Sequence, residues 1–128
     1  MRFLLDTHTF LWFILSDPQL SARARTLIED PVNEIEISPA SYWEIAIKIR
    51  LGKYSLPWPY DQFIEAQIRL NTFSILHIEP RHTSLSTTLP LHHKDPFDRL
   101  LVAQSLVEQI PLLSCDEAMD AYGVVRLW

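Results

Sequence analysis

Four carboxylates in this chain stand where a short apolar run meets the start of a helical pattern. These residues are Asp6, Glu44, Asp98 and Asp116. If the apolar runs are parallel strands, all four acids gather at one edge of a single sheet, which is where open α/β sheets bind ligands. Carboxylates crowded together repel one another unless cations are held between them. The pattern therefore predicts a site for Mg²⁺ or Mn²⁺, the hard cations that oxygen ligands suit.

Each of the four acids also has a purely structural explanation. Asp6 and Asp116 could cap the helices that follow them, and Asp98 could interact favourably with a helix dipole. Glu44 could complete a capping box, or it could pair with Lys48 one turn further along the helix. Considered one at a time, these explanations are sufficient.

Considered together, the four positions favour one shared site, because two of the helices already have other caps. Ser38 precedes Pro39 at the start of the helix that carries Glu44, and Asp95 precedes Pro96 in the same way before Asp98. The helix that carries Asp98 is apolar on nearly every side and is predicted to be buried, which makes an unpaired charge there costly.

The histidines and the single cysteine fit a metal site less well. His8 lies two residues after Asp6, and His92 and His93 lie in a loop, but no pair has the spacing of a zinc site. Loop and surface roles are therefore favoured for the histidines over metal ligation. Cys115 has no neighbouring histidine that would activate a thiol, and we expect it to pack at a strand end.

The elements that must position these residues alternate between strand and helix patterns. Strands are predicted over residues 2–5, 34–37, 73–78, 112–114 and 124–127. Helices are predicted over residues 7–15, 22–29, 39–51, 61–70, 80–88 and 95–109, with a short one from residue 116. Ser21 and Ser38 are the expected caps of the second and third helices, and Gly52 ends the third. The alternation predicts the α/β class, with a central parallel sheet of about four to five strands and helices on both faces.

Length and composition narrow the class of protein further. The 128 residues are enough for one domain with one core, and we expect the domain to span residues 1–128. The two glycines are too isolated to form a phosphate-binding glycine-rich loop. A single cysteine and the lack of an evident leader or membrane-spanning run predict a cytoplasmic protein that does not bind membranes. The net charge of −5 weakens a nucleic-acid role but does not exclude it, because some bases cluster locally.

Four motifs in one order carry a resemblance to a known family. They are FLLDTHTFLW at residues 3–12, SYWEIAIKIRLGK at 41–53, HKDPFDRLLVAQ at 93–104 and LLSCD at 112–116. In this order and spacing they resemble the PIN-domain ribonucleases, specifically the VapC-type toxins of prokaryotic toxin–antitoxin pairs. The resemblance covers essentially the whole chain. It departs from the family pattern at Ser114, where threonine is frequent, and at Ile110, where glycine is frequent.

The resemblance implies a single PIN-like domain that is a hydrolase, an endoribonuclease cutting single-stranded regions of RNA with Mg²⁺ or Mn²⁺. It also implies a homodimer that is silenced by a small antitoxin protein. The catalytic and metal-binding residues would be Asp6, Glu44, Asp98 and Asp116, with Asp6 and Asp98 as the foremost direct ligands. Supporting roles would fall to Asp95, Thr7 and Ser114. Phosphates of the RNA would meet Lys48, Arg50 or Arg99.

Three alternatives remain open from the sequence. A phosphoacceptor receiver domain has similar length and architecture, but it needs an adjacent acid pair after the first strand and a late lysine, and both are missing here. A PIN-like binding module without catalysis and a free-standing PIN nuclease of RNA processing would share the same fold. For partner contact, the aromatic stretch 54–60 and the helix beginning at Asp61 are favoured, although Trp58 could equally fold back onto the core.

Overall fold

The computed structural model describes residues 1–128, and at its centre lies a sheet of five strands, all parallel. The strands are β1 (Arg2–Leu5), β2 (Glu34–Ile37), β3 (Ser74–Ile75), β4 (Leu112–Leu113) and β5 (Arg126–Leu127). Their order across the sheet is β3-β2-β1-β4-β5, so the first strand of the chain is the central one. The predicted α/β class and parallel sheet are confirmed.

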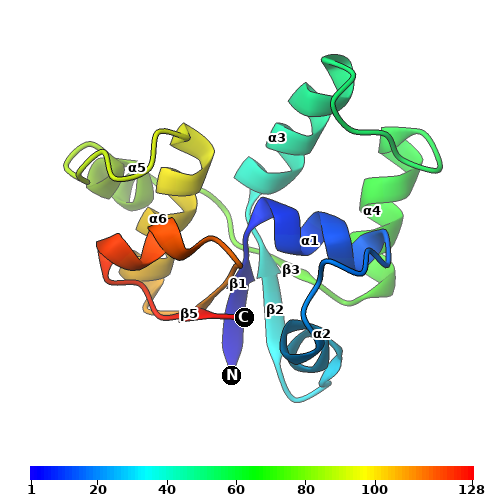
Figure 1. Cartoon of the computed structure of the whole chain (residues 1–128), viewed down its shortest axis with the longest axis horizontal. Helices are drawn as coiled ribbons and strands as arrows, with labels where there is room; N and C mark the ends of the chain where they lie inside the picture. The colour runs from blue at the N-terminus through cyan, green and yellow to red at the C-terminus, as the bar shows by residue number, and fades with distance from the viewer.

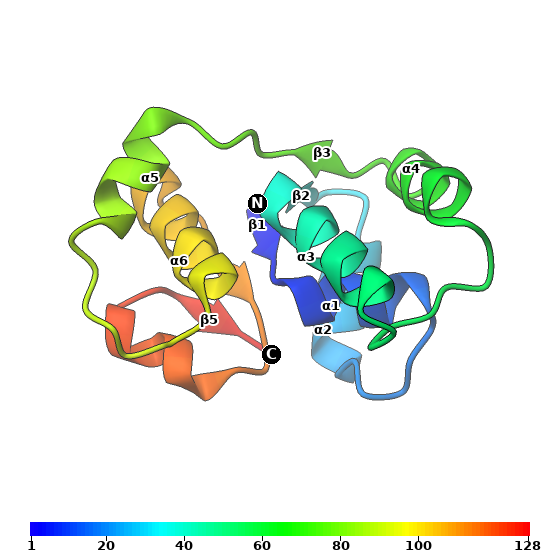
Figure 2. The same cartoon turned by 90° about the horizontal axis from the view of Figure 1, so that it is seen from above.

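Helices cover both faces of this sheet (Figures 1 and 2). They are α1 (Thr7–Ile14), α2 (Ala22–Glu29), α3 (Pro39–Arg50), α4 (Tyr60–Leu70), α5 (Pro80–Ser86), α6 (Pro96–Glu108) and the 3₁₀ helix η1 (Glu117–Tyr122). None of these helices is both long enough and apolar enough to span a lipid bilayer.

Alternation along β1 divides the apolar interior into two cores. Phe3 and Leu5 point to one face, where the side chains of α1, α2 and α4 complete a large cluster. Leu4 points to the other face and packs with residues of α6 and η1, among them Leu101 and Met119. Because β1 is buried on both faces, it holds Asp6, the residue that follows it, in a fixed place between the two layers.

The expected helix boundaries follow from local signals that the structure confirms. Ser21 and Ser38 cap α2 and α3 with their side chains, and Pro39 occupies the first turn of α3. Asp95 caps α6 by accepting a hydrogen bond from the Phe97 N–H at 2.8 Å. Gly52, just beyond the end of α3, has φ of +74°, a left-handed conformation that glycine adopts at little cost.

Strands β3, β4 and β5 are shorter than the sequence predicted, and the prediction that Cys115 packs at a strand end is wrong. Strand β3 ends at Ile75, and just beyond it the Gln104 side chain of α6 donates to the Leu76 carbonyl at 3.1 Å. At the other edge, Val125 contributes only its carbonyl, which accepts from Leu112 N–H at 2.8 Å. Cys115 is exposed rather than packed at the end of β4.

Candidate metal centre

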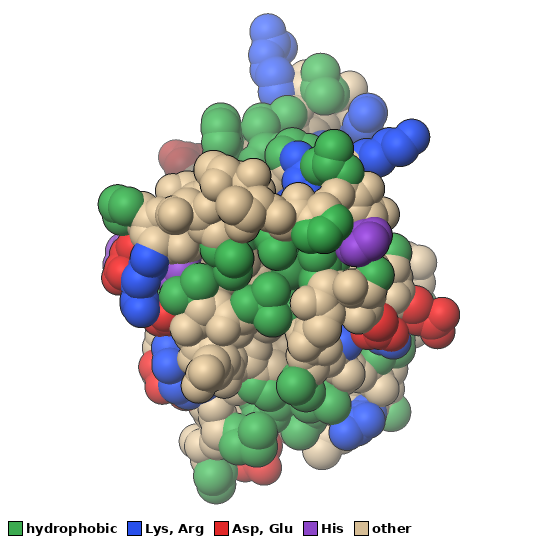
Figure 3. Space-filling view, turned by 90° about the vertical axis from the view of Figure 1, so that its left-hand side faces the viewer, with side chains coloured by type: hydrophobic (Ala, Val, Ile, Leu, Met, Phe, Trp, Pro, Cys, Tyr) green, Lys and Arg blue, Asp and Glu red, His purple; other side chains and the backbone are tan.

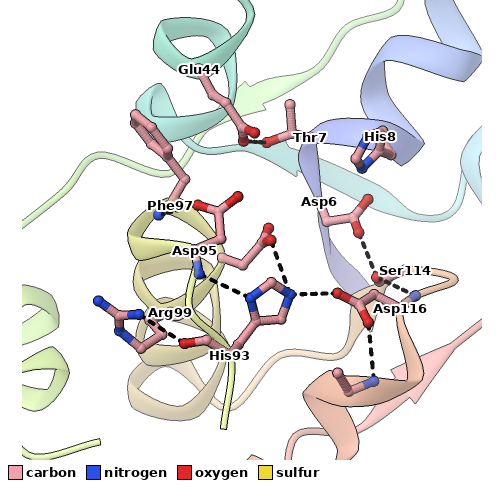
Figure 4. Close-up of polar contacts among 12 residues, drawn as sticks. Asp6, Thr7, His8, Glu44, His93, Asp95, Phe97, Arg99, Ser114 and Asp116 are labelled. Carbon is pink, nitrogen blue, oxygen red and sulfur yellow. Dashed lines mark hydrogen bonds and ion pairs between the residues drawn. The ribbon is translucent and has the colours of Figure 1, made fainter. Parts of the chain in front are cut away.

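The four acids converge at the carboxyl-terminal edge of the sheet, as their positions in the sequence predicted. Figure 4 shows Asp6, Glu44 and Asp116, and the negative charges of all three act on Asp98. Asp6 follows β1 and Asp116 follows β4, and the two strands are hydrogen-bonded neighbours. Glu44 projects from α3, which follows β2, and Asp98 projects from the first turn of α6. Four separate segments of the chain meet here, and the one that supplies Asp98 also supplies His93, in the loop before α6.

Asp6 is the most rigidly held of the four. It is 3% exposed and caps α1, its Oδ1 accepting from the Thr9 N–H at 2.8 Å. Its Oδ2 accepts from the Ser114 hydroxyl, which also accepts from the Asp116 N–H at 3.0 Å. Burial raises the pKa of the Asp6 carboxyl, and the hydrogen bonds from Ser114 and Thr9 oppose that shift. Capping and site membership therefore coexist in this residue.

Glu44 is equally buried, and both of its carboxylate oxygens likewise have partners. Oε1 accepts from the Thr7 hydroxyl at 2.8 Å, and Oε2 lies 2.7 Å from the Lys48 ammonium. Lys48 also donates to the Tyr54 hydroxyl at 3.4 Å. The pairing of Glu44 with Lys48, one of the structural explanations considered above, is present, and it directs the Lys48 ammonium to the protein rather than to solvent.

Asp98, like Asp6 and Asp116, pairs with no lysine or arginine. Burial, and after it the charges of Asp95, Asp6, Glu44 and Asp116, together raise the pKa of its carboxyl to about 8. At neutral pH the cluster therefore holds a proton on Asp98 in place of a full complement of negative charges. A divalent cation would offset the repulsion that contributes to this shift.

His93 lies in a loop, as expected, but its ring belongs to the acidic cluster rather than to the surface. Its Nε2 lies 2.7 Å from Asp116 Oδ2 and 3.3 Å from Asp98 Oδ2. The loop is fixed by Arg99, which donates to the His93 carbonyl at 2.8 Å, and by the Tyr122 hydroxyl, which accepts from the His93 N–H at 2.8 Å. The only sequence signal was its place two residues before the helix cap.

The environment of the His93 ring defines its tautomer. Nδ1 accepts a hydrogen bond from the Asp95 N–H at 3.2 Å, so the proton of the neutral ring sits on Nε2, facing the carboxylates. Metal-binding histidines have the opposite arrangement, in which the second ring nitrogen donates to a carbonyl or carboxylate. In this geometry His93 is a hydrogen-bond donor to Asp116 and Asp98 rather than a ligand.

The donor set fits a hard divalent cation. The site contains two groups of three potential ligand atoms, and within each group all atoms lie within 4.8 Å of one another. One group has an oxygen each from Glu44, Asp95 and Asp98, and the other has an atom each from His93, Asp98 and Asp116. Asp98 is common to both groups. Apart from His93, every donor is a carboxylate oxygen, the ligand type that Mg²⁺ and Mn²⁺ prefer.

The remaining predicted residues lie at different distances from this cluster. Ser114 and Thr7 each hold one of the acids, as described above. Arg50 is exposed at the end of α3, whereas Arg99 uses its guanidinium to hold the loop that carries His93.

A parallel α/β sheet with acids converging at its carboxyl edge defines the class of protein, and comparison with known proteins gives the family. Residues 3–125 match the model of the PIN domain. The chain belongs to the PIN domain family.

Among curated proteins, the chain is similar to Ribonuclease VapC16 of Mycobacterium tuberculosis (strain ATCC 25618 / H37Rv), with 38% identity over 71 residues. That alignment covers 52% of this chain and spans half of the relative's length, 50%.

Solved structures share the fold over nearly the whole chain. One is a chain of VapBC2 from Rickettsia felis, in a crystal structure bound to a DNA fragment from the VapBC2 promoter. It superposes with a TM-score of 0.67 at 16% identity, covering 99% of this chain and 98% of that one. A chain of VapBC-1 from nontypeable Haemophilus influenzae gives 0.65 at 19% identity, covering 99% and 97%. FitAcB from Neisseria gonorrhoeae gives 0.66 at 16% identity, covering 98% and 96%.

Proposed function

We propose that this protein is an endoribonuclease that cuts single-stranded regions of RNA with Mg²⁺ or Mn²⁺, and that it is the toxin of a toxin–antitoxin pair. The observation that carries the proposal is the convergence of Asp6, Glu44, Asp98 and Asp116 on one edge, with Asp98 left without a counter-ion and its pKa raised to about 8. The ribonuclease name of the curated relative supports the reaction class. The VapBC structures support the toxin role.

The residues of the cluster would have different roles, some binding the cation and others orienting its ligands. Asp98, whose carboxylate has no protein donor other than His93, and Asp6, which is fixed by Ser114 and Thr9, would hold the cation. A bound divalent cation would lower the pKa of water for attack and would offset the charge that develops on the phosphate. His93 would keep Asp116 oriented through its Nε2–H.

The reaction is tested by incubating the protein with labelled RNA, with and without Mg²⁺ or Mn²⁺. The proposal expects cleavage of single-stranded RNA that a chelator abolishes, with slower cleavage of an RNA duplex. Asp61→Asn is the matched control, because Asp61 is an exposed acid on α4 away from the cluster. Loss of cleavage in Asp98→Asn but not in Asp61→Asn would support the site. Equal cleavage with and without metal would contradict it.

A partner protein would bind on the far side of the molecule from α6. A cavity of about 570 Å³ there is lined mainly by apolar side chains of α3, α4 and β3, including Tyr42, Tyr60 and Ile64. Nearby, Trp58 is 57% exposed, its ring lying 5.7 Å from Phe63. This surface has the aromatic character of binding hot spots, and the antitoxin is the partner we propose for it.

Trp58→Ala tests the partner surface. It should weaken binding of an antitoxin encoded next to this gene while RNA cleavage stays intact, because Trp58 is remote from the acids. Lost cleavage with a lowered melting temperature would show instead that Trp58 serves the core. A gene without a neighbouring antitoxin would favour a free-standing nuclease of RNA processing. Sedimentation of the pure protein would test the proposed homodimer.

A further inference from the structure

One large aromatic side chain stands open to solvent beside the acidic cluster. Trp43 on α3 is 62% exposed, although tryptophan is highly buried on average. Its ring is held in one orientation because it packs edge to face against Phe97 of α6, with ring centroids 5.5 Å apart and ring planes at 83°. An exposed indole held in a fixed orientation offers a flat face on which a planar ligand can stack.

The pair is built into the two helices, α3 and α6, that supply two of the four acids. Trp43 directly precedes Glu44, and consecutive helical residues point about 100° apart, so Glu44 turns into the cluster while Trp43 turns out of it. Phe97 stands directly before Asp98, and its N–H is held by Asp95 at 2.8 Å. The aromatic pair therefore forms part of the rim of the acidic cluster, as the position of Phe97 in Figure 4 shows.

Cationic side chains continue outward from this rim. Trp43, Ile47 and Arg50 follow one another at helical spacing and share one side of α3, and Arg50 is exposed and makes no ion pair. Lys53, just beyond the helix, is also exposed. Figure 3 shows Lys and Arg side chains gathered at the top of the molecule, where α3 ends in Figure 1. A polyanion that reaches the acids over Trp43 would meet these charges next.

We propose that Trp43, supported by Phe97, is a stacking platform for one unpaired base of the RNA whose phosphate lies at the acidic cluster. This proposal rests on the proposed function and adds a physical basis for the choice of single strands. A base in a duplex is already stacked on its neighbours, whereas an unpaired base offers a free face to an aromatic ring. Every base has such a face, so the platform selects strandedness rather than sequence.

A nucleic acid fits this position better than a second protein surface does. Covering Trp43 with an apolar protein face would also cover Asp98 and Asp116, whose side chains are 17% and 36% exposed. Desolvating these carboxylates without a counter-ion is costly. An RNA strand brings its own cations and water to the same place.

The test measures binding of a fluorescein-labelled single-stranded RNA of about twelve nucleotides, a length within the range of single-strand sites. Asp98→Asn provides a background that holds the RNA without cutting it. In that background Trp43→Ala should weaken binding between about fivefold and a hundredfold, and Trp43→Phe should restore most of the loss. Trp58→Ala, which removes a similarly exposed tryptophan elsewhere, should leave binding unchanged.

A second measurement locates the stacked base. Oligonucleotides that lack the base at one position at a time are bound to proteins with and without Trp43. One abasic position should weaken binding to the protein with Trp43 and have no further effect on Trp43→Ala, which is the signature of a direct contact. If no abasic position couples to Trp43, the platform is wrong.

Two further outcomes separate this proposal from the one it rests on. If the wild-type protein cuts single-stranded RNA but Trp43→Ala binds and cuts equally well, the platform fails and the proposed function stands. If the wild-type protein neither cuts nor binds RNA, both fail. Conversion of a dimer into a monomer by Trp43→Ala, measured by sedimentation, would assign the ring to an interface between copies and overturn the platform.

Discussion

Helix α6 carries an acid in its first turn, Asp98, and another in its last turn, Glu108, and the two charges are balanced in different ways. Glu108 lies at the helix end where a negative charge is disfavoured, but Arg81 reaches it at 2.8 Å. Asp98 lies at the favourable end, yet burial and neighbouring acids raise its pKa to about 8. The structure thus pairs one acid with a base and leaves the other among acids.

This difference separates charges that serve the fold from charges that serve a site. The pair between Arg81 and Glu108 joins α5 to α6, and Arg81 also holds Glu79 at 2.7 Å. The contacts around Asp98 do not stabilise the fold in this way. Asp6 and Asp98 both have raised pKa values, so the proximity of the two carboxyls stabilises neither negative charge. Repulsion retained inside a folded protein is expected where function requires it.

The largest expected effect comes from neutralising the unpaired acid. Asp98→Asn should reduce RNA cleavage by more than about a hundredfold, because an amide is a poor ligand for a hard cation and even supporting contacts at metal sites are worth that much. The metal-free variant should be as stable as the wild type or more stable, since one repelling charge is gone. Glu108→Gln is the control for the comparison: it should keep cleavage and lose stability. The reverse pattern in denaturant melts and cleavage assays would break the comparison.

Divalent cations should stabilise the native protein by a smaller but substantial amount. A ligand that binds only the native state adds about 2.7 kcal/mol at a hundredfold excess over its Kd. The melting temperature should therefore rise with Mg²⁺ or Mn²⁺ at constant ionic strength, and it should rise much less in Asp98→Asn. A melting temperature that is indifferent to both cations would count against the site.

The stability of the metal-free protein should depend on pH in a direction set by Asp98. Its pKa in the folded protein is about 8, above its ordinary value of 3.8, so the folded state holds a proton that the unfolded state has released. The contribution of Asp98 to stability is therefore fully present below about pH 4 and is lost as pH rises toward about 8, with Asp6 acting in the same direction. Urea melts across this range should show the decline in the wild type, and a smaller one in Asp98→Asn. A rise in stability over the same range would contradict the pKa shift.

The smallest expected effect concerns the neighbouring acid. Asp95 caps α6, so Asp95→Ala should cost about 1 kcal/mol of unfolding free energy, as other caps do. Cleavage should fall less than in Asp98→Asn, although Asp95 also lies in one of the two groups of close carboxylates. If Asp95→Ala abolishes cleavage without destabilising the fold while Asp98→Asn stays active, the roles of the two acids are exchanged.

The parts of the fold that depend on neighbouring residues were predictable from the sequence. The caps at Ser21, Ser38 and Asp95 use side chains within three residues of the groups they bind. The convergence of the acids was predictable too, because parallel strands bring their carboxyl ends to one edge whatever their order. The pair between Glu44 and Lys48 also follows from spacing along one helix.

The parts that depend on distant residues were not predictable. The Leu76 carbonyl, just after β3, accepts a hydrogen bond from the side chain of Gln104 on α6. His93 enters the acidic cluster only because Arg99 and Tyr122 hold its loop there. Sequence periodicity does not indicate such long-range hydrogen bonds. A surface position was therefore predicted for His93, which lies in a loop and lacks the spacing of a zinc site.

The central claim, that the acids form a cation site with Asp98 as a ligand, is tested most directly by calorimetric titration of Mn²⁺ and Mg²⁺ at pH 7. The account predicts saturable binding that releases protons, because a carboxyl with a pKa of about 8 is largely protonated until a cation displaces its proton. The binding heat should then vary with the ionisation enthalpy of the buffer, and both the affinity and this variation should be lost in Asp98→Asn. Absence of binding, or equal affinity and equal proton release in wild type and Asp98→Asn, would contradict it.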